Sequence, residues 1–189
     1  IGRRQADIHA VRVAAGDADL LLGCDLVVSA SGDPLAKVDI ERSHAIVNAF
    51  ESPTAAFTRD PDVDFPAAAM KARIEEEVGP GKSAFIDATR IATALLGDAI
   101  AANLFLLGFA FQRGLVPLSA DAVERAIELN GVSRAFSRPA FLWGRRAAHD
   151  LAAVLAVAGL DAGDESDDPT LDDVIATRAA FLRDYQYEA

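Results

Sequence analysis

The sequence predicts an α/β fold, with a Rossmann-like parallel sheet flanked by helices and a helical C-terminal half. Two observations predict it. In the first half of the chain, short apolar runs bounded by turn residues alternate with helical patterns, as in parallel sheets covered by helices. After residue 88 the strand signal stops, and apolar residues recur at helical spacing instead.

Four short runs rich in apolar residues are predicted to be buried parallel strands. A short helix is expected at residues 17–23, between the first two strands. A stronger helical pattern covers residues 66–79, with Pro66 at its start and Gly79 at its end. The predicted strands are residues 8–13, 25–30, 44–49 and 84–88.

The longest apolar run, residues 89–113, is predicted to be a helix that is broken near Gly97. A membrane-spanning helix needs roughly 20 uninterrupted apolar residues, and polar residues such as Asp98 and Asn103 interrupt this run. We therefore expect a helix that is buried on most sides, inside a fold or an interface.

Two further helices are predicted after this run. The first covers residues 119–131, with Ser119 as its N-cap, and the second runs from about 138 to 158. An acidic stretch rich in Gly, Asp and Pro follows and is typical of an exposed linker. The expected organisation is one domain at 1–158, a linker at 159–169 and a helical tail at 170–189.

Composition limits the classes of partner. The chain is 51% hydrophobic, yet 29 acidic against 18 basic residues give it a net charge of −11. This combination suggests apolar surface covered by partners, including further copies of the chain, and the acidity argues against nucleic acid. The single cysteine, Cys24, lies in an apolar run and is expected to be a buried thiol in a reducing, cytoplasmic protein. No signal-peptide pattern and no membrane span are expected.

Motifs for binding phosphate or metal are weak in this sequence. It contains no GxGxxG, and the resemblance of residues 79–85 to a Walker A loop is superficial, so Lys82 and Ser83 are expected to connect a helix to a strand. The three histidines lie far apart and lack the spacing of a zinc pair. Ser29 and Ser31 are interpreted as residues at the end of a strand.

Candidate site residues lie mainly after the predicted strand at 44–49. Asn48, Glu51 and Thr54 belong to this strand end and the loop that follows, and loops at the carboxyl ends of parallel strands often carry function. Asn103 lies within the apolar helix, where a buried amide would need a hydrogen-bond partner from a neighbouring backbone or another chain. An ordinary connecting loop and a packing role are the alternatives.

A second group of candidates lies near Trp143. Arg145, Arg146 and His149 follow this aromatic residue closely in one predicted helix. Arginine beside an aromatic ring can bind a carboxylate, a phosphate or an acidic protein surface. The alternative is a solvated helical face.

Four collinear segments carry a resemblance to a known family. The segments ADIHAVRVAAGDADLLLGCDLVVSASGDPL (6–35), AIVNAFESPTAAFTRDPD (45–62), FIDATRIATALLGDAIAANLFLLGFAFQRGLVPLSADAVERAIELNGV (85–132) and WGRRAAHDL (143–151) resemble the gamma-type domain of 2-oxoacid:ferredoxin oxidoreductases. The closest likeness is to indolepyruvate oxidoreductase subunit beta and to the C-terminal region of fused indolepyruvate ferredoxin oxidoreductases. The family's glycine-rich GGQG strand-turn is missing from these residues and is expected upstream.

The resemblance implies a component of an enzyme that oxidatively decarboxylates aryl pyruvates and passes electrons to ferredoxin. Thiamine diphosphate, magnesium and iron–sulfur clusters are then expected on a partner subunit or domain, because one cysteine cannot supply the four thiolates of a cluster. The chain itself would bind no cofactor and would be inactive alone. In this view, the helix at 89–113 packs between the sheet and another polypeptide.

Two alternative functions remain open from the sequence. The first is a Rossmann-like module that binds a nucleotide or coenzyme A through a glycine-rich loop upstream of residue 1. The second is a purely structural oligomerisation domain, in which the loop around Glu51 has no part in activity.

Overall fold

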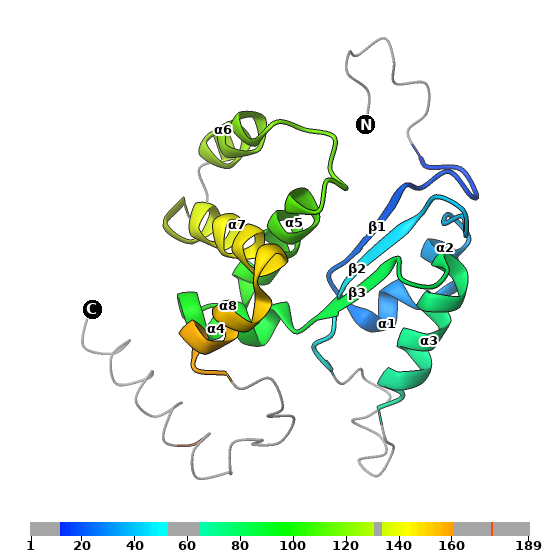
Figure 1. Cartoon of the computed structure of the whole chain (residues 1–189), viewed down its shortest axis with the longest axis horizontal. Helices are drawn as coiled ribbons and strands as arrows, with labels where there is room; N and C mark the ends of the chain where they lie inside the picture. Colours follow the sequence, from blue (N-terminus) through cyan, green and yellow to red (C-terminus); the bar gives the residue numbers. More distant parts are fainter. Residues whose placement is uncertain (1–11, 53–64, 131–133, 161–174, 176–189) are drawn as a thin grey trace. The chain divides into compact units, whose positions relative to one another are not determined.

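The computed structural model describes residues 12–52, 65–130, 134–160 and 175, and these residues form the predicted α/β fold (Figure 1). The chain divides into two compact units, Ile1–Gly159 and Leu160–Ala189. The named elements all belong to the first unit. They are β1 (Leu20–Gly23), α1 (Leu26–Ser29), α2 (Gly32–Leu35), β2 (His44–Asn48), α3 (Ala67–Val78), β3 (Ser83–Ile86), α4 (Ala88–Leu96), the short 3-10 helix η2 (Ala99–Ala101), α5 (Ala102–Gln112), α6 (Ala120–Asn130), α7 (Arg134–His149) and α8 (Leu151–Ala158).

Within the described residues, the sheet consists of three parallel strands in the order β1-β2-β3. Leu21 is paired with Ala45, and Val47 with Phe85. Because β2 is central, its side chains are enclosed from both faces, and Ala45, Ile46 and Val47 are fully buried. The run of apolar residues in β2 thus reflects burial on both faces, as is usual for parallel sheets.

Helices cover both faces of this sheet (Figure 1). On one face α1 and α3 contact the strands, while α5 contacts β1 and β2 from the other side. Alternate residues of a strand point to opposite faces, so Ala45 and Val47 join the α1–α3 face. The core on that face consists of Leu26, Ala30, Leu35, Val38, Ala45, Val47, Ala67, Ile74 and Val78.

The structure reverses two predicted elements near the N-terminus. Residues 17–23, expected as a helix, contain the strand β1, and residues 25–30, expected as a strand, contain the helix α1. Asp25 explains the helix, because its carboxylate accepts a hydrogen bond from the Val28 backbone N–H at 2.7 Å and caps α1. Capping by Asp25 thus outweighs the β-branched side chains of Val27 and Val28.

The elements predicted between residues 44 and 88 agree with the structure. The strand at 44–49 and the helix at 66–79 are confirmed as β2 and α3, and the strand at 84–88 is confirmed as β3, although Ala88 already begins α4. Of the strand expected at 8–13, residues 8–11 lie outside the described residues, whereas Arg12 and Val13 are not in a strand.

The helical half has the break predicted at Gly97 and a second break, at Asp150, that the sequence pattern did not predict. The apolar run is interrupted at Gly97, which adopts a left-handed conformation with φ of 79° and ends α4. Ser119 caps α6, since its hydroxyl accepts a hydrogen bond from the Ala122 N–H at 3.2 Å. The helix expected at 138–158 is instead two helices, α7 and α8, because the Asp150 carboxylate caps a new helix through the Ala153 N–H at 2.9 Å. The expected linker and tail lie outside the described residues, except for Ile175.

The apolar helix α5 lies between the sheet and α7 (Figure 1). The two helices approach closely because each contributes a glycine at the crossing. A Cβ atom at Gly108 would overlap the Phe141 carbonyl oxygen, and one at Gly144 would overlap the Phe105 carbonyl oxygen. The resemblance implies that the helix at 89–113 packs between the sheet and another polypeptide. In the structure, α7 of the same chain packs on the α5 part of this run, and a partner on the rest of it stays a prediction.

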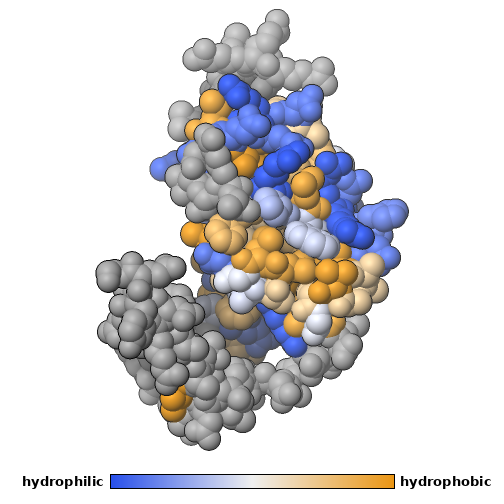
Figure 2. Space-filling view, turned by 90° about the vertical axis from the view of Figure 1, so that its left-hand side faces the viewer, coloured by the Kyte–Doolittle hydropathy of each residue, from blue (hydrophilic) through white to orange (hydrophobic). Residues whose placement is uncertain are grey.

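Hydrophobic side chains are exposed on the helical half of the first unit. Ile100, Leu129 and Val157 are 69%, 70% and 59% exposed, although each is large and apolar. Figure 2 shows hydrophobic residues gathered across the face that it displays. Apolar patches of this kind mark surfaces that contact a partner in many proteins. Within the described residues, the helices are too short or too polar to cross a membrane.

Candidate functional site

The carboxyl ends of the three strands meet at one edge of the sheet. Gly23 is paired with Val47, and Asn48 with Ile86, so the residues that follow each strand leave from the same edge. In open parallel sheets this edge is the usual place for ligand-binding groups. The residues located here are Cys24 and Asp25 after β1, Asn48 to Ser52 at the end of β2, and Asp87 to Arg90 after β3.

Asn48 lies at the centre of this edge and connects all three strand ends. Its amide nitrogen donates to the Cys24 carbonyl oxygen at 3.3 Å and to the Thr89 hydroxyl at 2.8 Å. Its amide oxygen accepts from the Ala88 N–H at 3.1 Å and from the Phe50 N–H at 3.3 Å. Asn48 is buried, with an exposed fraction of 5%. Asn48 is therefore a positioning residue that holds the loop after β2, rather than a group offered to a ligand.

Two aspartates at the same edge cap the helices that begin there. The Asp25 carboxylate caps α1, and the Asp87 carboxylate accepts from the Arg90 N–H at 2.8 Å at the start of α4. A helix N-terminus attracts anions through its unpaired N–H groups. Here a carboxylate of the chain already occupies that position at both helices.

Cys24 follows β1 and is exposed, so the expectation of a buried thiol is wrong. Partial burial of the sulfur nevertheless raises the pKa of the Cys24 thiol. The thiolate is the nucleophilic form of cysteine. A raised pKa lowers its fraction at neutral pH, which argues against a nucleophilic role.

The remaining candidate residues are not brought together by the described structure. Glu51 is exposed on the loop after β2, whereas Thr54 lies outside the described residues. Asn103 lies in the first turn of α5 and is exposed, so its amide is open to water and requires no buried partner. Ser29 and Ser31 are not strand-end residues, because Ser29 is the last residue of α1 and Ser31 precedes α2.

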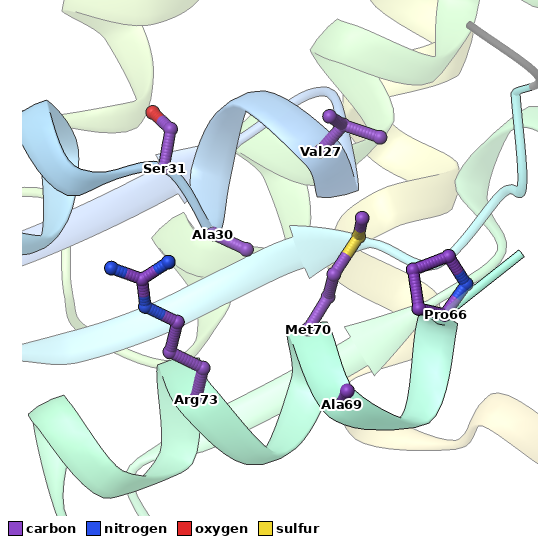
Figure 3. A pocket seen from close by; sticks show the side chains of 7 residues that line it. All are labelled: Val27, Ala30, Ser31, Pro66, Ala69, Met70 and Arg73. Carbon is purple, nitrogen blue, oxygen red and sulfur yellow. The ribbon is translucent and has the colours of Figure 1, made fainter. Parts of the chain in front are cut away.

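A groove that the sequence did not indicate lies between α1 and α3, with a volume of about 340 Å³ (Figure 3). Figure 3 shows the Met70 and Arg73 side chains reaching from α3 toward α1. The lining is mostly apolar and ends in one guanidinium. The lining residues are Val27, Ala30, Ser31, Pro66, Ala69, Met70 and Arg73.

The arginines near Trp143 stack on aromatic rings. The Arg145 guanidinium lies 5.3 Å from the centre of the Phe111 ring and 5.9 Å from that of Phe141, and its Nε donates to the Gln112 side chain at 3.0 Å. Arg146 lies over the Trp143 ring at 5.4 Å. The contacts of Arg145 with Phe111 and Gln112 connect α7 to α5, whereas Arg146 contacts Trp143 within α7. Arg145 thus has a packing role that neither an anion site nor a solvated helical face describes.

Lys82 also has a structural role, as predicted from the connection between helix and strand. Its ammonium group donates to the carbonyl oxygens of Ile40 and Glu41 at 2.6 and 2.7 Å. The ammonium group thus connects the start of β3 to the loop before β2. The described residues contain no group of three or more His, Cys, Asp or Glu side chains that could hold a metal ion.

The described residues form an α/β fold with a three-stranded parallel sheet and a helical second half. Comparisons of the chain with protein-family models, with curated proteins and with solved structures found no match.

Proposed function

We propose that the chain is the component without cofactors of an indolepyruvate-type 2-oxoacid:ferredoxin oxidoreductase. In this proposal, a partner subunit or domain carries thiamine diphosphate, magnesium and iron–sulfur clusters, and decarboxylates aryl pyruvates. The chain completes the complex and orders the loop after β2, which includes the exposed Glu51, at the entrance to the partner's active site.

The collinear order of the four segments between residues 6 and 151 carries this proposal. The α/β fold is consistent with it, because the second segment covers most of the central strand β2, and the third covers the end of β3 and all of α5. The hydrophobic residues exposed on the helical half support a role in a complex, since the chain is otherwise strongly acidic.

The residues of this chain do not fit the family's redox centres. A four-iron cluster requires four thiolates, and the sequence has the single cysteine Cys24. We therefore assign no step of the reaction to the chain itself. Its contribution is to hold the strand ends through Asn48 and to offer surface to the partner.

The alternative, a nucleotide- or coenzyme A-binding module, is less well supported at the described strand ends. A pyrophosphate would compete with Asp25 and Asp87 for the N-termini of α1 and α4. A carboxylate at that position also repels phosphate. Weak or absent binding of ATP, NAD and coenzyme A in calorimetry would agree with this argument.

The proposed function is tested by reconstitution. The partner that carries thiamine diphosphate and clusters is assayed alone and with this chain, using indolepyruvate or phenylpyruvate as substrate and a viologen dye as electron acceptor. We expect faster dye reduction when the chain is present. A rate that is the same with and without the chain would argue for a structural oligomerisation domain or another function.

A further inference from the structure

We propose that the groove between α1 and α3 binds a small carboxylic acid with an apolar body. Small-molecule sites are typically concavities of about 300–1,000 Å³ with mostly apolar walls and few polar groups. The groove falls in this range at about 340 Å³. Its lining residues differ from those named at the carboxyl edge, and the proposal does not depend on the proposed oxidoreductase role.

The apolar walls come from side chains that both helices direct into the groove. Val27 and Ala30 come from α1 and its C-cap, and Ala69 and Met70 come from α3 (Figure 3). Ala30 and Ala69 contribute only small side chains to the lining, which leaves room for a flat ligand. Met70 adds a flexible thioether, which adapts to ligand shape and contacts aromatic rings favourably.

The charge of the ligand follows from Arg73. This residue lies on the same side of α3 as Ala69 and Met70, because residues three and four positions apart share a helix face. Its guanidinium extends toward α1 (Figure 3). Among the ion pairs of the described residues, none includes Arg73.

Guanidinium groups bind carboxylates through two parallel hydrogen bonds. One cation above an apolar surface therefore matches a ligand with one negative charge and a hydrophobic remainder. A phosphate monoester would bring a charge of about −1.5 to −2 at neutral pH, which is more than one arginine compensates. The structure thus favours an arylalkanoate or a similar monocarboxylate.

The proposal is tested by titrating the full chain with 3-phenylpropionate and following backbone amide signals by NMR. We expect saturable shifts at residues of α1 and α3. The neutral analogue 3-phenylpropionamide, which lacks the charge, and acetate, which lacks the apolar body, should each bind at least about tenfold more weakly.

Variants separate the contributions of charge and shape. Arg73→Gln should weaken binding of 3-phenylpropionate by at least about tenfold, whereas Lys71→Gln, which removes one charge from the same helix outside the groove, should not. Ala69→Leu should block the groove while the fold is kept, since Ala69 is exposed. Equal binding of acid and amide, or equal loss in Arg73→Gln and Lys71→Gln, would overturn the proposal.

Discussion

Asn48 shows how one side chain can organise the carboxyl edge of a small parallel sheet. Both of its amide hydrogens and its oxygen are used, and its partners come from the ends of all three strands. One of these partners, the N–H of Ala88, belongs to a residue that is fully buried. A buried donor without an acceptor is costly, so the amide matters more for stability than its size suggests.

Replacement of Asn48 by alanine should lower the free energy of unfolding by about 2–4 kcal/mol, because it removes these hydrogen bonds and leaves the Ala88 N–H without an acceptor. Urea denaturation measures this change. The matched control is Asn103→Ala, which changes an exposed residue of α5 and should alter the free energy by no more than about 0.5 kcal/mol. Equal losses in the two variants would contradict the role assigned to Asn48.

Cys24 gives a prediction on pH dependence. Desolvation disfavours the charged thiolate, so the pKa of the thiol is higher in the folded chain than in the unfolded chain. Alkylation by iodoacetamide requires the thiolate. The pH at which alkylation reaches half its maximal rate should therefore be higher for the folded chain than for the chain unfolded in urea. A lower midpoint in the folded chain would indicate a stabilised thiolate and reopen a nucleophilic role.

At the scale of elements, α5 and α7 cross with their backbones in close approach. Gly108 and Gly144 allow each backbone to contact the other, and the apolar run of α5 is buried as a result. Phe111 and Phe141 extend the contact, with ring centres 5.4 Å apart. The glycines are therefore required by the partner helix rather than by their own backbone conformation.

Gly108→Ala and Gly144→Ala should each destabilise the chain by about 1–3 kcal/mol or more, because the new methyl group must displace the facing backbone. Alanine is the better helix former by about 1 kcal/mol, so a loss of stability would come from the crossing alone. Thermal denaturation provides the measurement.

Gly32→Ala is the control for these variants. Gly32 lies in α2, and a Cβ atom there would have open space around it. This variant should keep or slightly raise the melting temperature. If the variants at Gly108 and Gly144 behaved like Gly32→Ala, the close crossing of α5 and α7 would be wrong.

The elements also show where sequence patterns succeed. Long patterns with clear boundaries predict their elements correctly, as for the helix α3 between Pro66 and Gly79 and for the break at Gly97. The reversal of β1 and α1 arose because both segments are short apolar runs, and such runs do not separate strand from helix by periodicity. The missed signal was Asp25, whose position before the apolar run is typical of an N-cap.

For the whole molecule, the sequence predicted the fold class better than the site. The parallel sheet and the helical second half follow from local patterns, which are read directly from neighbouring residues. The network around Asn48 and the groove at Arg73 join residues far apart in the chain, so no local pattern predicts them. The sequence indicates Asn48 as a candidate because it ends a predicted strand. Its structural role depends on hydrogen-bond partners that only the folded structure brings to it.

The central claim is that the chain acts by binding a partner that carries the cofactors. Sedimentation velocity of the chain mixed with the thiamine diphosphate- and cluster-bearing subunit, at micromolar concentrations, tests this claim most directly. The account predicts that the chain sediments with the partner in a fixed ratio, as one larger species. If the two sedimented independently at every concentration, the claim would be contradicted.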